Sequence, residues 1–169
     1  TVPRAQKQPF SALSVEGPMA RNVADCALMF ECEAGAHFLD PMSRPVPSGS
    51  YSAAAARPQK PKRVAFSVDL GVTPVVHRDT RAVVEAAAKK IAGDGVVVEE
   101  VHPDLSDAVR NFMVLRGAIY IARIAPLLEK HRHLLKPEVI GNTEFGLSLK
   151  LSDVVAAEIA QGEIVRRMA

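Results

Sequence analysis

The sequence contains serines and lysines, but no pattern that would activate a serine as a nucleophile. The sequence lacks the G-x-S-x-G pattern, which places a serine on a strand-to-helix turn. It also lacks the S-x-x-K pattern, which places a lysine beside a serine. The stretch D-L-G-V-T-P, residues 69–74, has one glycine where a dinucleotide-binding loop needs three. The sequence therefore predicts no catalytic residue and no cofactor.

Histidines and cysteines are the residues that would hold a transition metal. The histidines lack the H-E-x-x-H pattern, and His131 and His133 lie two apart, on different faces of a predicted helix. Cys26 and Cys32 lie six apart in another predicted helix, so their side chains point in different directions and do not favour a disulfide. We expect no metal site, and two reduced thiols of the kind found in the cytoplasm.

Asp69 is the acidic residue whose position is most suggestive of a ligand. It ends the predicted strand at 63–69, and ligands of α/β proteins often bind at the carboxyl ends of strands. The other interpretation is that its side chain caps a turn before Gly71, as Asp commonly does. We favour the turn.

The composition is that of one globular domain, with 169 residues, 48% of them hydrophobic and 24% charged. The net charge of +2 and the absence of a Lys/Arg stripe argue against a nucleic-acid partner. The apolar runs are shorter than a membrane span, which argues against a membrane. Because the sequence begins at Thr1, without Met or a signal-peptide pattern, we expect an interior part of a longer polypeptide.

The first 62 residues predict one helix between irregular segments. Asn22 is suited to cap this helix, and Asp25 can reach back toward it. Apolar residues at i, i+3, i+4 and i+7 form one stripe that would face a core: Val23, Cys26, Ala27 and Phe30. Residues 40–62 contain five prolines and several small residues, which predicts a long surface connection without helix or strand.

The next segment predicts a strand, a helix and a strand in that order. Alternating residues at 63–69, an apolar stripe over 78–92 and a β-branched run at 95–101 supply the three elements. This order favours two adjacent parallel strands joined by a crossover. The expected fold class is therefore α/β.

The remaining residues are expected to be helical. Ser106 and Ser152 can each cap a helix, whereas Pro126 and Pro137 are expected to interrupt or restart one.

Residues that interrupt regular secondary structure precede the first predicted helix, in the stretch L-S-V-E-G-P-M-A-R-N-V-A-D-C-A-L at 13–28. Gly17 and Pro18 are expected to turn the chain sharply, because Gly is permissive and Pro fixes φ and lacks a donor. Arg21 then lies just outside the helix, where its guanidinium can bind carbonyls or a carboxylate, with Asp25 as one candidate partner. We expect Gly17, Pro18, Arg21 and Asp25 to have structural roles.

Extended to Gly35, this stretch resembles the amidase signature family. In that family a Gly-Pro-hydrophobic-x-Arg segment leads into a helix with a Val-x-Asp-x-Ala core. The matching residues are Gly17, Pro18, Arg21, Val23, Asp25 and Ala27. The resemblance continues through the segments 40–47, 63–71, 95–101 and 145–168.

The resemblance implies a hydrolase of carboxamides that uses a Ser, a second Ser in a cis peptide and a Lys. In the family these residues lie in a Gly/Ser-rich region N-terminal to the matching stretch, and none of their motifs occurs here. The resemblance therefore implies no catalytic residue in this chain. It implies part of the amidase-signature fold over residues 1–169, a mixed sheet flanked by helices that is incomplete as a domain.

In the intact enzyme the implied substrate is a small amide. This chain would supply scaffold and part of the acyl-binding wall, with 112–120 and 145–151 as the candidate wall segments. The alternative is a non-catalytic interaction module or pseudo-enzyme that resembles the amidotransferase A subunit, and a solute-binding α/β domain is a third interpretation. Exposed sheet or helix faces are expected to support self-association.

Overall fold

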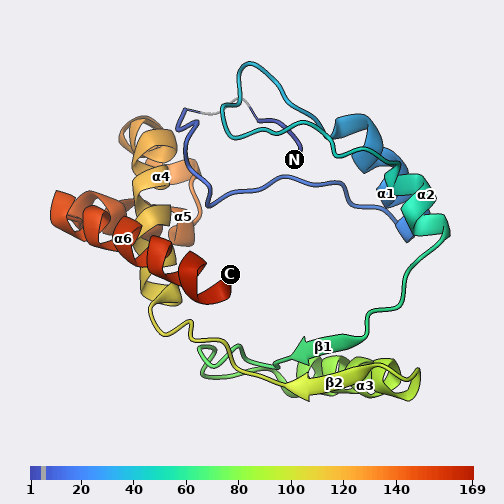
Figure 1. Ribbon diagram of the computed structural model, residues 1–169. Coiled ribbons are helices and arrows are strands. Elements are labelled where there is room, and N and C mark those ends of the chain that lie inside the picture. Colours follow the sequence, from blue (N-terminus) through green and yellow to red (C-terminus); the bar gives the residue numbers. More distant parts are fainter. Residues whose placement is uncertain (5–6) are drawn as a thin grey trace. The chain divides into compact units, whose positions relative to one another are not determined.

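The computed structural model describes residues 1–4 and 7–169 and combines helices with a small parallel sheet, so the chain is of the α/β class (Figure 1). Two compact units divide it: Thr1–Gln59 with Ile119–Leu135, and Lys60–Ala118 with Lys136–Ala169. The elements are α1 (Val23–Glu33), α2 (Tyr51–Ala56), β1 (Arg63–Phe66), α3 (Arg78–Gly93), β2 (Val97–Glu100), α4 (Ala108–His131), the 3₁₀ turn η1 (Arg132–Leu134), α5 (Pro137–Ser148) and α6 (Leu151–Met168).

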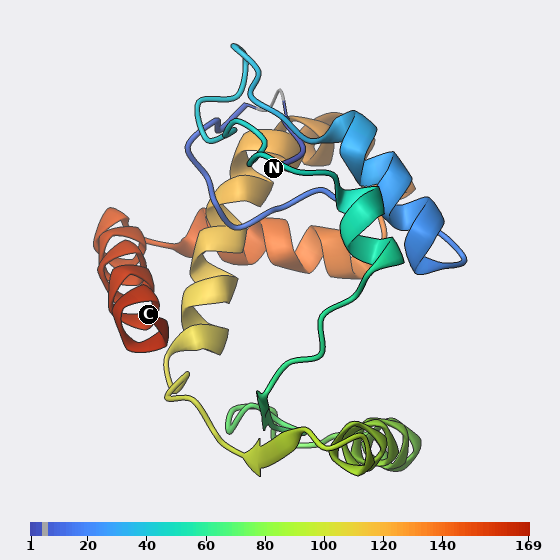
Figure 2. The same cartoon turned by 45° about the vertical axis from the view of Figure 1, so that its right-hand side comes forward.

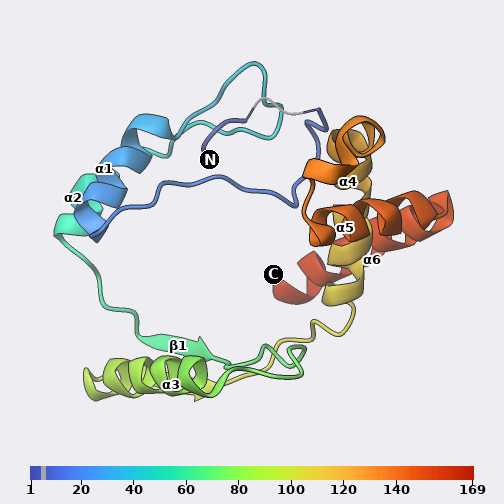
Figure 3. The same cartoon turned by 180° about the vertical axis from the view of Figure 1, so that it is seen from behind.

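In the first unit, α1 and the short helix α2 lie side by side (Figure 3). The prediction that 40–62 contains no helix or strand is wrong for Tyr51–Ala56. Ser50 caps this helix by accepting a hydrogen bond from the backbone N–H of Ala53 at 3.1 Å. Four consecutive alanines follow Ser52, and Ala has the highest intrinsic helix propensity.

In the second unit, β1 and β2 pair in parallel, with Arg63 opposite Val97 and Phe66 opposite Glu100. The predicted strand, helix, strand order is thus confirmed, and α3 packs against β2. The strands are shorter than expected, since β1 ends at Phe66 rather than at residue 69. The polar side chains that follow β1 hold the loop, as described below.

The helix α4 continues through Pro126 to His131, so the expected interruption does not occur. A proline inside a helix leaves the carbonyl four residues earlier without its usual donor. That carbonyl belongs to Ala122, and it accepts a hydrogen bond from Lys7 Nζ at 3.3 Å. A side chain remote in sequence therefore replaces the backbone bond that Pro126 cannot make.

In the second unit, α5 lies across α4 (Figure 2), and two glycines meet at the crossing. A Cβ atom on Gly146 would lie 2.5 Å from the carbonyl oxygen of Gly117, and one on Gly117 would lie 3.0 Å from the Cα of Gly146. Both glycines are buried. The two backbones touch because neither residue has a side chain. As predicted, α5 begins at Pro137, the position where proline is best tolerated.

The caps observed for α4 and α6 differ from those expected. The helix α6 begins after Lys150, not Ser152, and Asp153 accepts a hydrogen bond from the Lys150 backbone N–H at 2.8 Å. Ser106 does not cap α4, since the helix begins at Ala108 and the position before it is Asp107; the Ser106 hydroxyl instead donates to the carboxylate of Asp104 at 2.8 Å. This bond lowers the pKa of Asp104 below its usual value.

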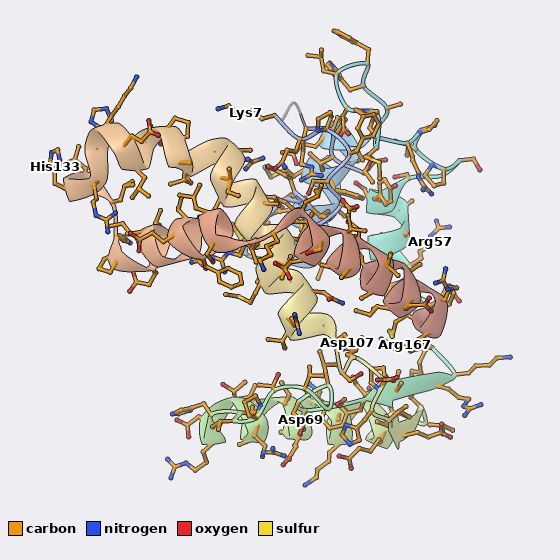
Figure 4. All side chains as sticks on the ribbon, turned by 90° about the vertical axis from the view of Figure 1, so that its left-hand side faces the viewer. Lys7, Arg57, Asp69, Asp107, His133 and Arg167 are labelled. Atoms are coloured by element: carbon orange, nitrogen blue, oxygen red, sulfur yellow. The ribbon has the colours of Figure 1, made fainter. Side chains whose placement is uncertain are left out.

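Asp104 also tethers the other end of α6. Arg167 Nη1 lies 3.4 Å from Asp104 Oδ2, and Figure 4 shows Arg167 near the start of α4, where Asp107 is labelled. The ion pair is partly exposed, so solvent screens it and its contribution to stability is expected to be small.

Burial of apolar side chains is sparse. Among the described residues, those classed as buried and hydrophobic are Val96, Val114 and Ala157. The side chain with the lowest exposure is a polar one, Thr143, whose hydroxyl donates to the Val139 carbonyl at 2.7 Å. Backbone contacts and side-chain hydrogen bonds therefore carry much of the packing within each unit.

The α4–α5 crossing yields a stability prediction. We expect Gly146→Ala to lower the free energy of unfolding by about 1–3 kcal/mol, because the added methyl overpacks the crossing. Gly141, on the same helix, is the matched control, since a Cβ there would meet nothing within 4 Å. Gly141→Ala should raise stability by about 0.5–1 kcal/mol through helix propensity. Urea unfolding followed by circular dichroism measures both, and equal effects would contradict the crossing.

Candidate functional site

The backbone forms no turn or bend at Gly17 and Pro18, and Gly17 does not have a positive φ; the bend nearest to α1 lies at Arg21 and Asn22. The sharp turn expected at Gly17 is therefore absent. The cause is local, because a proline pushes the residue before it into extended conformations. A Cβ at Gly17 would also meet nothing within 4 Å, so no crowding requires a glycine at this position.

The start of α1 is held by Asn22 and Asp25. The Asn22 side-chain oxygen accepts the Asp25 backbone N–H at 2.9 Å, which confirms the predicted cap. Asp25 does reach back, but its carboxylate accepts from the Asn22 side-chain amide at 2.8 Å rather than from Arg21. Arg21 is exposed, and no described residue forms an ion pair with it.

An apolar groove opens between α1 and α2. It has a volume of about 420 Å³. Its lining consists of Pro18, Val23, Cys26, Ala27, Phe30, Tyr51 and Ala55. The predicted apolar stripe of α1 therefore lines an open groove and does not face a filled core. Cys26 is half-buried here, and its thiol lies 3.5 Å from the carbonyl oxygen of Pro18.

Contacts at one side of this groove fix α2 against α1. The rings of Phe30 and Tyr51 meet edge to face, with centroids 4.7 Å apart. The Glu31 carboxylate accepts from both the hydroxyl and the backbone N–H of Ser52. The Ser52 hydroxyl lowers the pKa of Glu31 most, so this carboxylate stays ionised as a second acceptor at the start of α2.

Asp40 is a buried carboxylate that the sequence did not single out, with 4% of its surface exposed. Its two oxygens accept the backbone N–H groups of Arg4 and Met42, at 2.8 and 2.9 Å. Ser43 closes the loop, because its hydroxyl donates to the Asp40 carbonyl at 2.6 Å and accepts the His37 N–H at 2.8 Å. The sequence feature that could have identified Asp40 is the Asp-Pro pair at the start of the segment 40–47.

The Arg4 N–H lowers the pKa of Asp40 below its ordinary value of 3.8, the Met42 N–H acts in the same direction, and burial opposes both. The ionised carboxylate therefore joins the N-terminal segment to the loop at 40–47. Its role is structural, since both oxygens are already occupied by backbone donors.

Asp69 lies in the loop after β1, at the carboxyl end of the strand (Figure 4). Its Oδ1 accepts the Gly71 backbone N–H at 2.8 Å, which confirms the turn interpretation. Leu70, between them, has a positive φ of 54° and donates its N–H to the Ser67 hydroxyl at 2.9 Å. The polar side chains of this loop thus satisfy its own backbone.

Ser67 and His102 come together at the same edge, with Ser67 Oγ 3.0 Å from His102 Nδ1. In a catalytic triad the acid and the serine bind opposite ring nitrogens. Here Asp69 Oδ1 lies 3.5 Å from the same nitrogen as Ser67, and Glu100 lies 3.8 Å from Nε2, beyond hydrogen-bond range. This arrangement links the ends of β1 and β2 and does not orient the imidazole as a base.

The two candidate wall segments meet in the second unit, since Gly117 belongs to 112–120 and Gly146 to 145–151. Phe112 and Phe145 retain 43% and 38% of their surface exposed, so both rings are available to a neighbour. The guanidinium of Arg116 lies over the Phe112 ring, 5.6 Å from its centroid.

No group of three His, Cys, Asp or Glu side chains suited to a metal ion occurs in residues 1–4 and 7–169. Ala108–Leu134, which comprises α4 and η1, is long and apolar enough to cross a membrane by length and composition, with a mean hydropathy of 1.3. Arg110, Arg116 and Arg123 divide this segment, so its uninterrupted apolar runs are short, as the sequence indicated. Core helices of soluble proteins pass the same test.

At the start of α1, the effect of a helix cap on stability can be compared with that of an exposed charge. We expect Asn22→Ala to lower the free energy of unfolding by about 0.5–2 kcal/mol through loss of the cap. Arg21→Lys should change it by less than about 0.5 kcal/mol, as exposed substitutions usually do. Thermal and urea unfolding of both variants test this. A larger loss for Arg21→Lys than for Asn22→Ala would show that the guanidinium has a partner that matters.

Acid should destabilise the loop that Asp40 holds. A carboxyl whose pKa is lowered on folding contributes stability above its unfolded value, and this is lost as the pH falls through the folded pKa. We therefore expect a loss of stability below pH 3.8. Asp40→Asn should be less stable at neutral pH and respond less to acid. Glu16→Gln, at an exposed carboxyl, is the control and should keep the wild-type profile; an unchanged profile in Asp40→Asn would refute this role.

Comparison with known proteins agrees with the family resemblance of the stretch that leads into and forms α1. A family model described as Amidase matches residues 1–163. Neither the curated proteins nor the solved structures that were compared give a match. Because the family match covers nearly all of the 169 residues, the chain belongs to the amidase family.

Proposed function

We propose that this chain is a segment of an amidase that contributes scaffold and part of the substrate-pocket wall but no catalytic residue. The observation that carries the proposal is the family match over residues 1–163 of a sequence without the family's Ser, cis-Ser and Lys motifs. The intact enzyme would hydrolyse a small carboxamide by acyl transfer to a serine outside this chain. Its fold would be the amidase-signature fold, with a mixed sheet flanked by helices, of which this chain is an incomplete part.

The environments of Lys7, Lys60 and Ser67 support this proposal. Lys7 and Lys60 donate to the backbone carbonyls of Ala122 and Asp94, at 3.3 and 2.7 Å, rather than to serine hydroxyls. Ser67 lies 3.0 Å from His102 Nδ1, but no acid lies within hydrogen-bond distance of the opposite ring nitrogen, because Glu100 is 3.8 Å from it. Neither arrangement provides an activated nucleophile.

We assign the wall to the crossing of α4 and α5. The Gly117–Gly146 contact brings the backbones of both candidate segments together and leaves the rings of Phe112 and Phe145 partly exposed. Apolar rings of this kind suit the acyl group of an amide substrate. The proposal also places the chain in the cytoplasm, on the strength of its two free cysteines.

A hydrolysis assay tests the proposal. We expect the purified chain to cleave neither an anilide nor a nitrophenyl ester above the buffer background, because it lacks nucleophile and base. A fluorophosphonate probe should label no serine. Turnover that persists through repurification and disappears in Ser67→Ala would refute the proposal, because it would identify a working nucleophile in this chain.

The alternative is a non-catalytic interaction module or pseudo-enzyme resembling the amidotransferase A subunit. The open apolar groove of α1 and α2 supports the segment interpretation rather than this alternative, because a part of a larger domain leaves uncovered the apolar faces that the rest of the domain would cover. Under both interpretations the partners are proteins or a small amide. Nucleic acid and membrane are not among the partners we propose.

Self-association through this groove is the prediction that follows from the segment interpretation. We expect multi-angle light scattering to give an average mass above 18.2 kDa that rises with protein concentration. Val23 lines the groove and is 74% exposed, so Val23→Lys should shift the chain toward monomer. Leu134, outside the groove and 73% exposed, supplies the control Leu134→Lys, which should leave association unchanged. A monomer at all concentrations, or equal effects of the two variants, would refute it.

A further inference from the structure

We draw no further inference here: the strongest candidate, the open apolar groove between α1 and α2, belongs to the surface already proposed for self-association, and nothing in the structure shows what covers it.

Discussion

Carboxylates bound to backbone N–H groups are the interaction that holds several loops and the start of one helix in this chain. Asp40 joins two segments of the first unit, Asp69 closes the loop after β1, and Asp153 holds the start of α6. Bonds of this kind satisfy groups that helix ends and tight loops would otherwise leave without partners. They matter more here than in an ordinary domain because few apolar side chains are buried. Local order therefore rests on polar contacts, while the apolar faces of several helices remain available.

Local rules predicted the elements whose pattern and cap lie close together in sequence. Asn22 and the apolar residues after it gave α1, and the alternation around Val64 with the β-branched run near Val98 gave two parallel strands. Each of these depends on neighbours within a few residues, which is the range in which side-chain periodicity and capping operate.

The remaining features depend on groups that are distant in sequence. Lys7 satisfies the carbonyl that Pro126 leaves open, 115 residues away, so the proline does not end α4. In the sequence, nothing distinguishes Gly117 and Gly146 from other glycines in helices. The structure shows that two helix backbones meet at them. Periodicity carries no information about such tertiary partners.

Under the proposed function, this chain is the part of an amidase that carries family motifs but not the catalytic centre. Its residues 1–163 match the amidase family, and the polar clusters at Asp40, Asp69 and His102 hold loops in place. The central claim is that the catalytic Ser and Lys lie outside this chain. Reading the genomic sequence in frame before the codon for Thr1 tests it most directly. We predict an upstream Gly/Ser-rich stretch that carries two serines and a lysine, whereas a start codon immediately before Thr1 would contradict the account.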